Sequence, residues 1–312
     1  MFKCVGAAII PMIRNVINET EACTFLKEIV EYDTRSIPIH IQIVSQGKVN
    51  KQWVSHVQTW TNEVIRKGPL SNPPPNLLIT IWKTTAELQA FYHREREELG
   101  VVTGEETEFL ATHEAWRGHP RIHICEERLK GVPEAVIQGT LHHEISHALH
   151  HGSPEFYTFR FSNRLQEIGR SCGLDLQSLK YCVYLLSVAI KDQEAIRWLA
   201  EIGLGFSQRA LLEYLVSDTQ EERKVWEVAR GSPGLRKLAI AALLKIPLSI
   251  EAMISSEAQA LKDKWNKAYE WLSDSKRMEL LQFAKSTLQD KGKSFQERLE
   301  QATIRFLTDP SL

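Results

Sequence analysis

The feature that most constrains this chain is a dense cluster of histidines in one short segment. Five of its eleven histidines lie within the run LHHEISHALHHG, from Leu141 to Gly152. Pro133 precedes the run at a spacing that suits the first turn of a helix, and Gly152 stands where helices commonly stop. We therefore expect one helix from Pro133 to Gly152 that carries all five histidines.

Within this helix, residues 143–147 read HExxH. Residues four apart lie on one face of a helix, so the imidazoles of His143 and His147 can reach one metal ion. Zn²⁺ accepts neutral imidazole nitrogens at about 2.0–2.1 Å. Glu144 lies about 100° further round the helix, beside such an ion, where its carboxylate can take a proton from water. The pattern predicts a zinc site with His143 and His147 as ligands and Glu144 as general base.

The surroundings of the motif favour a site over a chance pattern in a solvated helix end. A separate stripe of the same helix is apolar and comprises Ile137, Leu141, Ile145 and Leu149. One face can therefore pack while the histidine face is left for a site. The cluster has three further histidines, His142, His150 and His151. We interpret them as residues that orient a ligand, face a substrate or stay in solvent.

A catalytic zinc usually has three protein ligands and one open position, so a third ligand must come from elsewhere in the chain. Asp192 is the first candidate, because it falls in an apolar helical stripe and a buried aspartate is costly unless it is paired or metal-bound. The stripe comprises Cys182, Leu185, Ala189, Ile196 and Leu199. The alternative interpretations of Asp192 are a buried salt bridge and a contact that orients a ligand histidine.

Three glutamates are weaker candidates for the third ligand. Glu194 lies on the other side of the same predicted helix and ranks second. Glu167 ranks third, because it lies among the polar residues of its own predicted helix. Glu155 lies in the loop after the histidine-rich helix and is expected to point away from it.

Hydrophobic periodicity divides the chain into a mixed first part and a helical second part. Strands are expected over 37–44, 77–82, 108–115 and 121–125, and helices over 19–32, 52–67 and 86–99. The run GPLSNPPPN at 68–76 is expected to be a stiff connector, because proline restricts the backbone and removes hydrogen-bond donors. After the histidine-rich helix the pattern predicts helices over 155–171, 176–202, 207–216, 219–229, 233–245, 255–273, 275–290 and 294–307.

These elements predict an α+β fold, in which a small twisted sheet and the HExxH helix are followed by an all-helical C-terminal region. The expected catalytic domain spans residues 1–203, with an N-terminal α/β part at 1–76 and a catalytic core at 77–203. Residues 204–312 are expected to form a helical extension.

Composition argues against several kinds of partner. The 38 basic and 39 acidic residues give a formal net charge of −1, so a general polyanion binder is not expected. We find no segment that suits a membrane span or a secretion signal. The five cysteines show no paired spacing, which favours reduced thiols and a cytoplasmic location. The expected partner is a peptide or protein substrate, and the oligomeric state is left open.

On these residues the chain resembles the zincin metallopeptidases, over about residues 77–203, and in general character it resembles predicted microbial zinc peptidases. Members of the zincin superfamily carry HExxH on a helix behind a small twisted sheet, and the gluzincin branch takes an acidic ligand from a later helix. In several such families, including the ImmA/IrrE-like peptidases, that helix reads ExxA. Here Asp192-Gln193-Glu194-Ala195 stands in that place, with aspartate instead of the ligand glutamate. The metzincin pattern is absent, since His150 and Ser153 stand where its glycine and third histidine would be.

The resemblance implies a zinc-dependent metallopeptidase with one Zn²⁺ per chain, held by His143, His147 and Asp192. It also implies an edge strand, from 121–125 or 108–115, to which an extended substrate adds by strand pairing. Two other classes remain open. One is a metal-binding module without catalysis, whose helical region binds a protein or DNA partner. The other is a helical interaction protein in which HExxH arose by chance.

Overall fold

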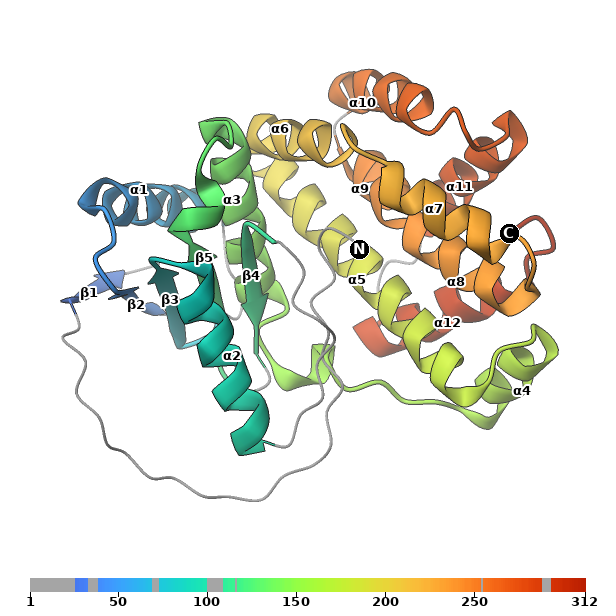
Figure 1. Cartoon of the computed structure of the whole chain (residues 1–312), viewed down its shortest axis with the longest axis horizontal. Helices are drawn as coiled ribbons and strands as arrows, with labels where there is room; N and C mark the ends of the chain where they lie inside the picture. The colour runs from blue at the N-terminus through green and yellow to red at the C-terminus, as the bar shows by residue number, and fades with distance from the viewer. Residues whose placement is uncertain are drawn as a thin grey trace. The chain divides into compact units, whose positions relative to one another are not determined.

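The described part of the chain is an α+β structure (Figure 1). The computed structural model describes residues 26–32, 39–68, 73–99, 109–115, 117–253, 255–287 and 293–312. The described residues separate into two compact units, a first unit up to Thr158 and a second unit from Phe159 to Leu312. The first unit holds a sheet with helices on both faces, and the described residues of the second unit form helices and connecting loops. The predicted α+β class is therefore confirmed.

The sheet of the first unit has five strands in the order β1-β2-β3-β5-β4. Their bounds are β1 (Leu26–Tyr32), β2 (Ile39–Gln46), β3 (Asn76–Trp82), β4 (Ala111–Glu114) and β5 (Arg121–Cys125). The three middle strands run parallel, whereas β1 and β4 pair antiparallel at the two edges. The middle strands are rich in isoleucine and largely buried, as expected for parallel strands with helices on both faces.

The first strand corrects one prediction. A helix was expected over residues 19–32, but residues 26–32 pair with β2 in register from Leu26 opposite Ser45 to Tyr32 opposite Ile39. The residues 19–25 of the predicted helix lie outside the described part. The segment includes adjacent β-branched residues, which are common in strands, and β2 offers it an edge to pair with. Tertiary pairing therefore outweighed an apolar spacing that also suited a helix.

Helices cover both faces of this sheet. Helices α1 (Lys51–Lys67) and α3 (Glu134–His150) contact each other on one face, and α2 (Thr85–Leu99) lies on the other. Alternation along β5 separates the two faces. Ile124 lines a small apolar cavity together with residues of α1 and α3, whereas Arg121 pairs with Glu95 of α2. The turn between β4 and β5 contains Gly118 at φ +91°, a left-handed conformation that glycine adopts without strain.

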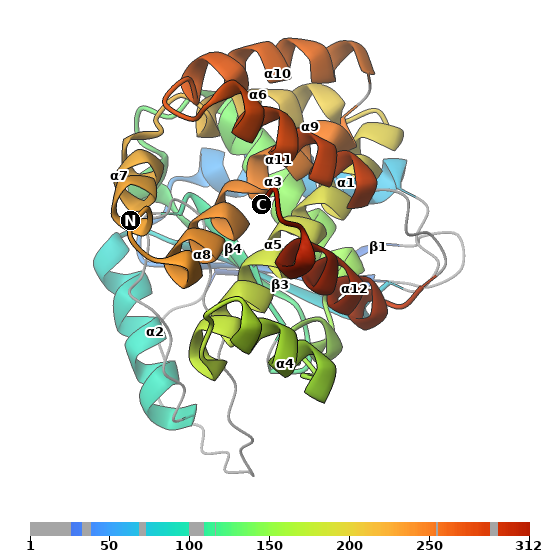
Figure 2. The same ribbon diagram turned by 90° about the vertical axis from the view of Figure 1, so that its right-hand side faces the viewer.

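The second unit is built around one long helix, α5 (Leu176–Glu201), which contacts α8 and α9 extensively. Figure 2 shows α4 and α12 beside it, and both contact it. The remaining helices have the bounds α4 (Asn163–Ser171), α6 (Gly205–Leu215), α7 (Gln220–Ala229), α8 (Pro233–Leu243), α9 (Lys245–Ala252), α10 (Ser255–Ala268), α11 (Asp274–Thr287) and α12 (Phe295–Thr308).

The two compact units divide after Thr158, so α4 and α5 belong to the helical unit. The boundary of a catalytic domain at residue 203 stays a prediction. Helix α5 belongs to the helical unit because, among the described elements, it packs most extensively against α9 and α8, which follow it in the chain.

Two segments of the helical region differ most from the sequence prediction. No helix was expected over 246–252, but α9 (Lys245–Ala252) covers this segment and tolerates Pro247, which lies in its first turn. The helix expected over 155–171 is shorter, with a 3₁₀ turn at Pro154–Phe156 before α4 begins.

Among the described residues, no helix is both long enough and apolar enough for a membrane span. Cys125, Cys172 and Cys182 are free thiols, and the other two cysteines lie outside the described part.

Candidate metal centre

The HExxH segment lies in α3, which begins and ends close to the predicted bounds. Pro133 stands at its N-cap and His151 at its C-cap. The side chains of His143 and His147 project from successive turns and are almost fully enclosed, at 8% and 4% exposure. Buried imidazoles need polar partners, so the surroundings of these two rings determine what the segment can do.

The two histidines of the motif face each other through the same ring atom. Nε2 of His143 lies 3.0 Å from Nε2 of His147, and the rings meet edge to face at 88°. Two nitrogen ligands of a tetrahedral zinc at about 2.0–2.1 Å would lie roughly 3.4 Å apart. The observed separation is close to this value, so the pair is spaced to share one ion.

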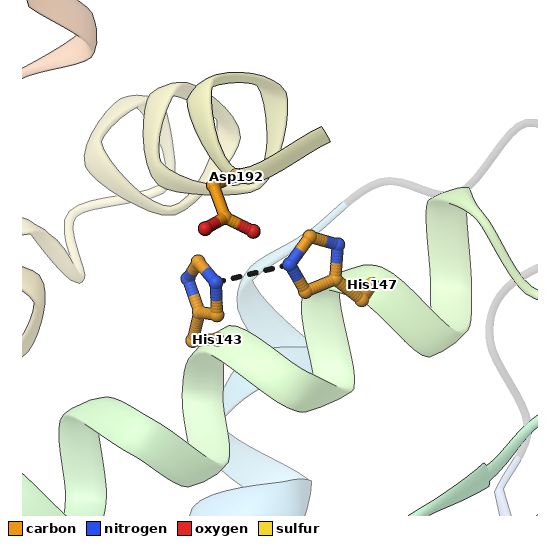
Figure 3. Close-up of side chains that lie close together, drawn as sticks. All are labelled: His143, His147 and Asp192. Atoms are coloured by element: carbon orange, nitrogen blue, oxygen red, sulfur yellow. Dashed lines mark hydrogen bonds between the residues drawn. The ribbon is translucent and has the colours of Figure 1, made fainter. Parts of the chain in front are cut away.

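Asp192 on α5 completes a possible ligand set. Its side chain is buried, and its carboxylate and the two histidine rings each offer a ligand atom, all within 4.8 Å of one another. Figure 3 shows the carboxylate directed toward both rings. Two imidazole nitrogens and one carboxylate oxygen form a donor set that suits zinc. The group His143–His147–Asp192 could therefore hold a metal ion.

Asp192 also takes part in an ion pair within the second unit. Its Oδ2 lies 2.8 Å from Nζ of Lys245, at the start of α9. The neighbouring Lys191 is buried too, and burial lowers the pKa of its amine to about 8. A buried carboxylate needs compensating positive charge, and Lys245 supplies it to one oxygen. The prediction that Asp192 is buried is confirmed. The alternative interpretation of Asp192, a buried salt bridge, agrees with its ion pair to Lys245.

The other acidic candidates do not join this group. Glu194 forms an ion pair with Arg298 of α12. Glu167 is exposed on α4, as the polar surroundings of that position suggested. Glu155 is exposed after α3 and accepts a hydrogen bond from Ser153 Oγ at 3.2 Å.

Glu144 has a partner that sequence analysis did not identify. Its side chain is 15% exposed, and its Oε2 lies 3.4 Å from Nδ1 of His113 on β4. The His113 ring stacks on that of His147 at 10° and 4.8 Å between centroids, and its Nε2 contacts the hydroxyl of Tyr157. No local motif marks His113 or Tyr157. Alternation along β4 would have indicated the face of His113 only if the strand bounds and the neighbouring helix had been known.

The remaining histidines of the cluster separate into three environments. His151 is buried, and its Nδ1 lies 3.0 Å from Nδ1 of His147. It therefore contacts a candidate ligand, and a role in orienting that ligand stays a prediction. His142 is fully buried, its Nε2 lies 3.6 Å from Glu63 Oε2, and burial lowers its pKa to about 4. His150 is exposed.

Comparison with protein-family models, with curated proteins and with solved structures gives no match for this chain. The likeness to zincins accordingly depends on the residues of the chain alone.

Proposed function

We propose that this chain is a zinc-dependent metallopeptidase that hydrolyses peptide bonds and uses one zinc ion per chain. The observation that carries the proposal is the buried His143–His147–Asp192 group with the carboxylate of Glu144 close by on α3. Glu144 follows His143 directly and contacts a histidine that stacks on His147. An acid beside a possible metal site is the arrangement that metal-assisted hydrolysis needs.

The roles follow from the chemistry of each side chain. His143, His147 and Asp192 would hold the ion, which when bound supplies Lewis acidity toward a water molecule and a peptide carbonyl. Glu144 takes the proton of the attacking water on a carboxylate oxygen. It then gives that proton to the amine of the departing peptide, which restores the carboxylate for another cycle.

Strand β4 supports a peptide as the substrate. It is the last strand of the sheet within the described residues, and it contacts α3. An edge strand presents unpaired backbone groups to which an extended peptide can add. His113, which lies beside Glu144, belongs to this strand, so a peptide aligned along β4 would pass near the proposed base.

Metal analysis and hydrolysis together test the proposal. Zinc per chain is measured in wild type and in the variants His147→Ala, Asp192→Ala and Glu194→Ala. Glu194 is a matched control, because it lies on α5 two positions from Asp192 and pairs with Arg298. We expect one zinc in wild type and in Glu194→Ala, and loss of zinc in the other two variants. Glu144→Gln should keep zinc and lose hydrolysis of fluorescein-labelled casein.

The ion pair of Asp192 with Lys245 favours a second candidate, in which Asp192 has a structural role and is not a metal ligand. In that case Asp192→Ala would lower stability without changing metal content. Equal behaviour of wild type and Glu144→Gln toward casein would support a non-catalytic metal-binding module. Wild type without zinc, even after zinc is supplied, would contradict both metal-dependent functions.

A further inference from the structure

We propose that Tyr157 and His113 form a hydrogen-bond chain that holds Glu144 in position for proton transfer. The inference deepens the proposed function and rests on it, because Glu144 is the proposed general base. All three side chains belong to the first unit, which brings them together from β4, α3 and the segment after the 3₁₀ turn at Pro154–Phe156.

The contacts place His113 between the other two residues. Its Nδ1 lies 3.4 Å from Oε2 of Glu144, and its Nε2 contacts the Tyr157 hydroxyl. The contact with Glu144 is at ion-pair distance in the absence of substrate, and we expect it to shorten to a hydrogen bond when a substrate binds, as is common among catalytic groups. Both the imidazole and the carboxylate are largely enclosed, with side-chain exposures of 9% and 15%. Little solvent therefore competes for the contact.

Hydrogen-bond chemistry gives the chain a direction. An ionised carboxylate only accepts, so His113 must donate to Glu144 from Nδ1. In a neutral imidazole with its proton on Nδ1, Nε2 is an acceptor. The Tyr157 hydroxyl then donates to Nε2. The hydrogen-bond chain thus runs from the Tyr157 hydroxyl through His113 to Oε2 of Glu144. This leaves Oε1 of Glu144 as the oxygen that exchanges protons with the reacting water.

The stacking of His113 links this chain to the ligand pair. The ring that contacts Glu144 also lies parallel to the ring of His147, 4.8 Å away between centroids. A single side chain from β4 therefore contacts both the proposed base and a proposed ligand. Misplacement of a catalytic group by 1 Å can cost about 10²-fold in rate, so a rigid support for Glu144 has a clear purpose. His113 is a positioning residue, since it acts through Glu144.

Three substitutions of His113 separate positioning from simple packing. The amide N–H of Asn lies near the place of histidine Nδ1, whereas that of Gln lies near Nε2. We expect His113→Ala to lower kcat for casein about 10²-fold with little change in KM and with one zinc retained. His113→Asn should recover a large part of kcat, and His113→Gln should not. Tyr157→Phe should lower kcat by a smaller factor.

His93→Ala is the matched control. His93 is another histidine of the first unit beside a glutamate, with Nδ1 3.5 Å from Glu97, but its side chain is 69% exposed. This variant should retain wild-type kcat. Full kcat in His113→Ala, or equal values for the Asn and Gln variants, would overturn the proposal. Loss of zinc from His113→Ala would do so too, since His113 would then support the metal ligands and not the base.

A readout that needs no activity keeps this inference distinct from the proposed function. The ¹⁵N chemical shifts of the His113 ring in the metal-free protein should show a protonated Nδ1 and an acceptor Nε2. Tyr157→Phe should shift Nε2, and Glu144→Gln should shift Nδ1. A proton on Nε2 alone would reverse the chain and refute it. If wild type cleaves no casein while these shifts are found, peptidase activity fails and the hydrogen-bond chain stands.

Discussion

Nδ1 of His147 lies 3.0 Å from Nδ1 of His151, one helical turn further along α3, while Nε2 of His147 faces His143. Both ring nitrogens of His147 are therefore engaged by other histidines of the same helix. Metal-bound histidines usually bond through their second nitrogen to a partner that sets the tautomer and the ring orientation. Phe156 packs against the His151 ring at 5.0 Å and keeps this partner in place.

His151→Ala should weaken zinc binding about 10–100-fold, because His147 loses the contact that orients its ring. Competition with a chromophoric chelator measures the affinity. His150→Ala is the control, since the neighbouring histidine is exposed, and it should bind zinc as wild type does. Equal affinities for wild type and the His151 variant would contradict this role.

Lys245→Gln should destabilise the metal-free protein by about 2–4 kcal/mol, because it removes one cation, the Lys245 amine, from the buried carboxylate of Asp192. Bound zinc would supply positive charge to the same carboxylate, so the loss should be smaller in the zinc-loaded protein. Urea unfolding with zinc and with a chelator measures both values. An equal loss in the two conditions would show that Asp192 and the ion do not interact.

Glu95→Gln should destabilise the first unit by about 3–5 kcal/mol, because it removes a charge that two arginines share. The guanidinium of Arg121 donates to both oxygens of Glu95 at 2.7 and 2.8 Å, and Nε of Arg117 lies 2.9 Å from one of them. Arg121 is almost fully buried, so the lost charge of Glu95 would not be replaced by water, and Arg121 would keep its ion pair with Glu114. Chemical denaturation followed by far-UV circular dichroism measures the change. Glu97→Gln, on the exposed side of α2, should cost little.

Cys182 should contribute to loss of stability at alkaline pH. Burial raises the pKa of its thiol from 9.0 to about 12. Between these values the unfolded chain releases a proton that the folded chain retains, so the free energy of unfolding falls as pH rises. The slope from this group approaches about 1.4 kcal/mol per pH unit. The difference in unfolding free energy between wild type and Cys182→Ala should therefore shrink from pH 9 to 11. A constant difference would contradict the shifted pKa.

Local patterns carried most of what could be predicted from the sequence. The bounds of α3 and β5 follow from a proline, a glycine and an alternating run, all of which act within a few residues. Asp192 could be singled out because a charged residue in an apolar helical stripe is informative without knowledge of the fold. The outcome at β1 was different, because pairing with β2 decided the conformation of residues 26–32.

The parts that could not be predicted depend on contacts between distant segments. Lys245 approaches Asp192 because α9 packs on α5, and the sequence around Pro247 did not indicate a helix there. His113 reaches Glu144 because β4 pairs antiparallel with β5 and turns alternate side chains toward α3. Such contacts arise from strand register and helix packing. The residues next to each partner in the sequence do not reveal either of these.

The placement of His143, Glu144 and His147 on one continuous helix, with His151 at its C-cap, has a mechanical consequence. Their mutual orientation is set by the pitch of α3 and not by the docking of separate segments. Inserting one alanine between Glu144 and His147 would turn everything beyond it by about 100°, so His147 would leave its partner while His151 moved with it. The same insertion before Pro133 would leave the order of these groups intact. An insertion within the motif therefore separates these side chains, whereas an insertion before the helix leaves their relative positions unchanged.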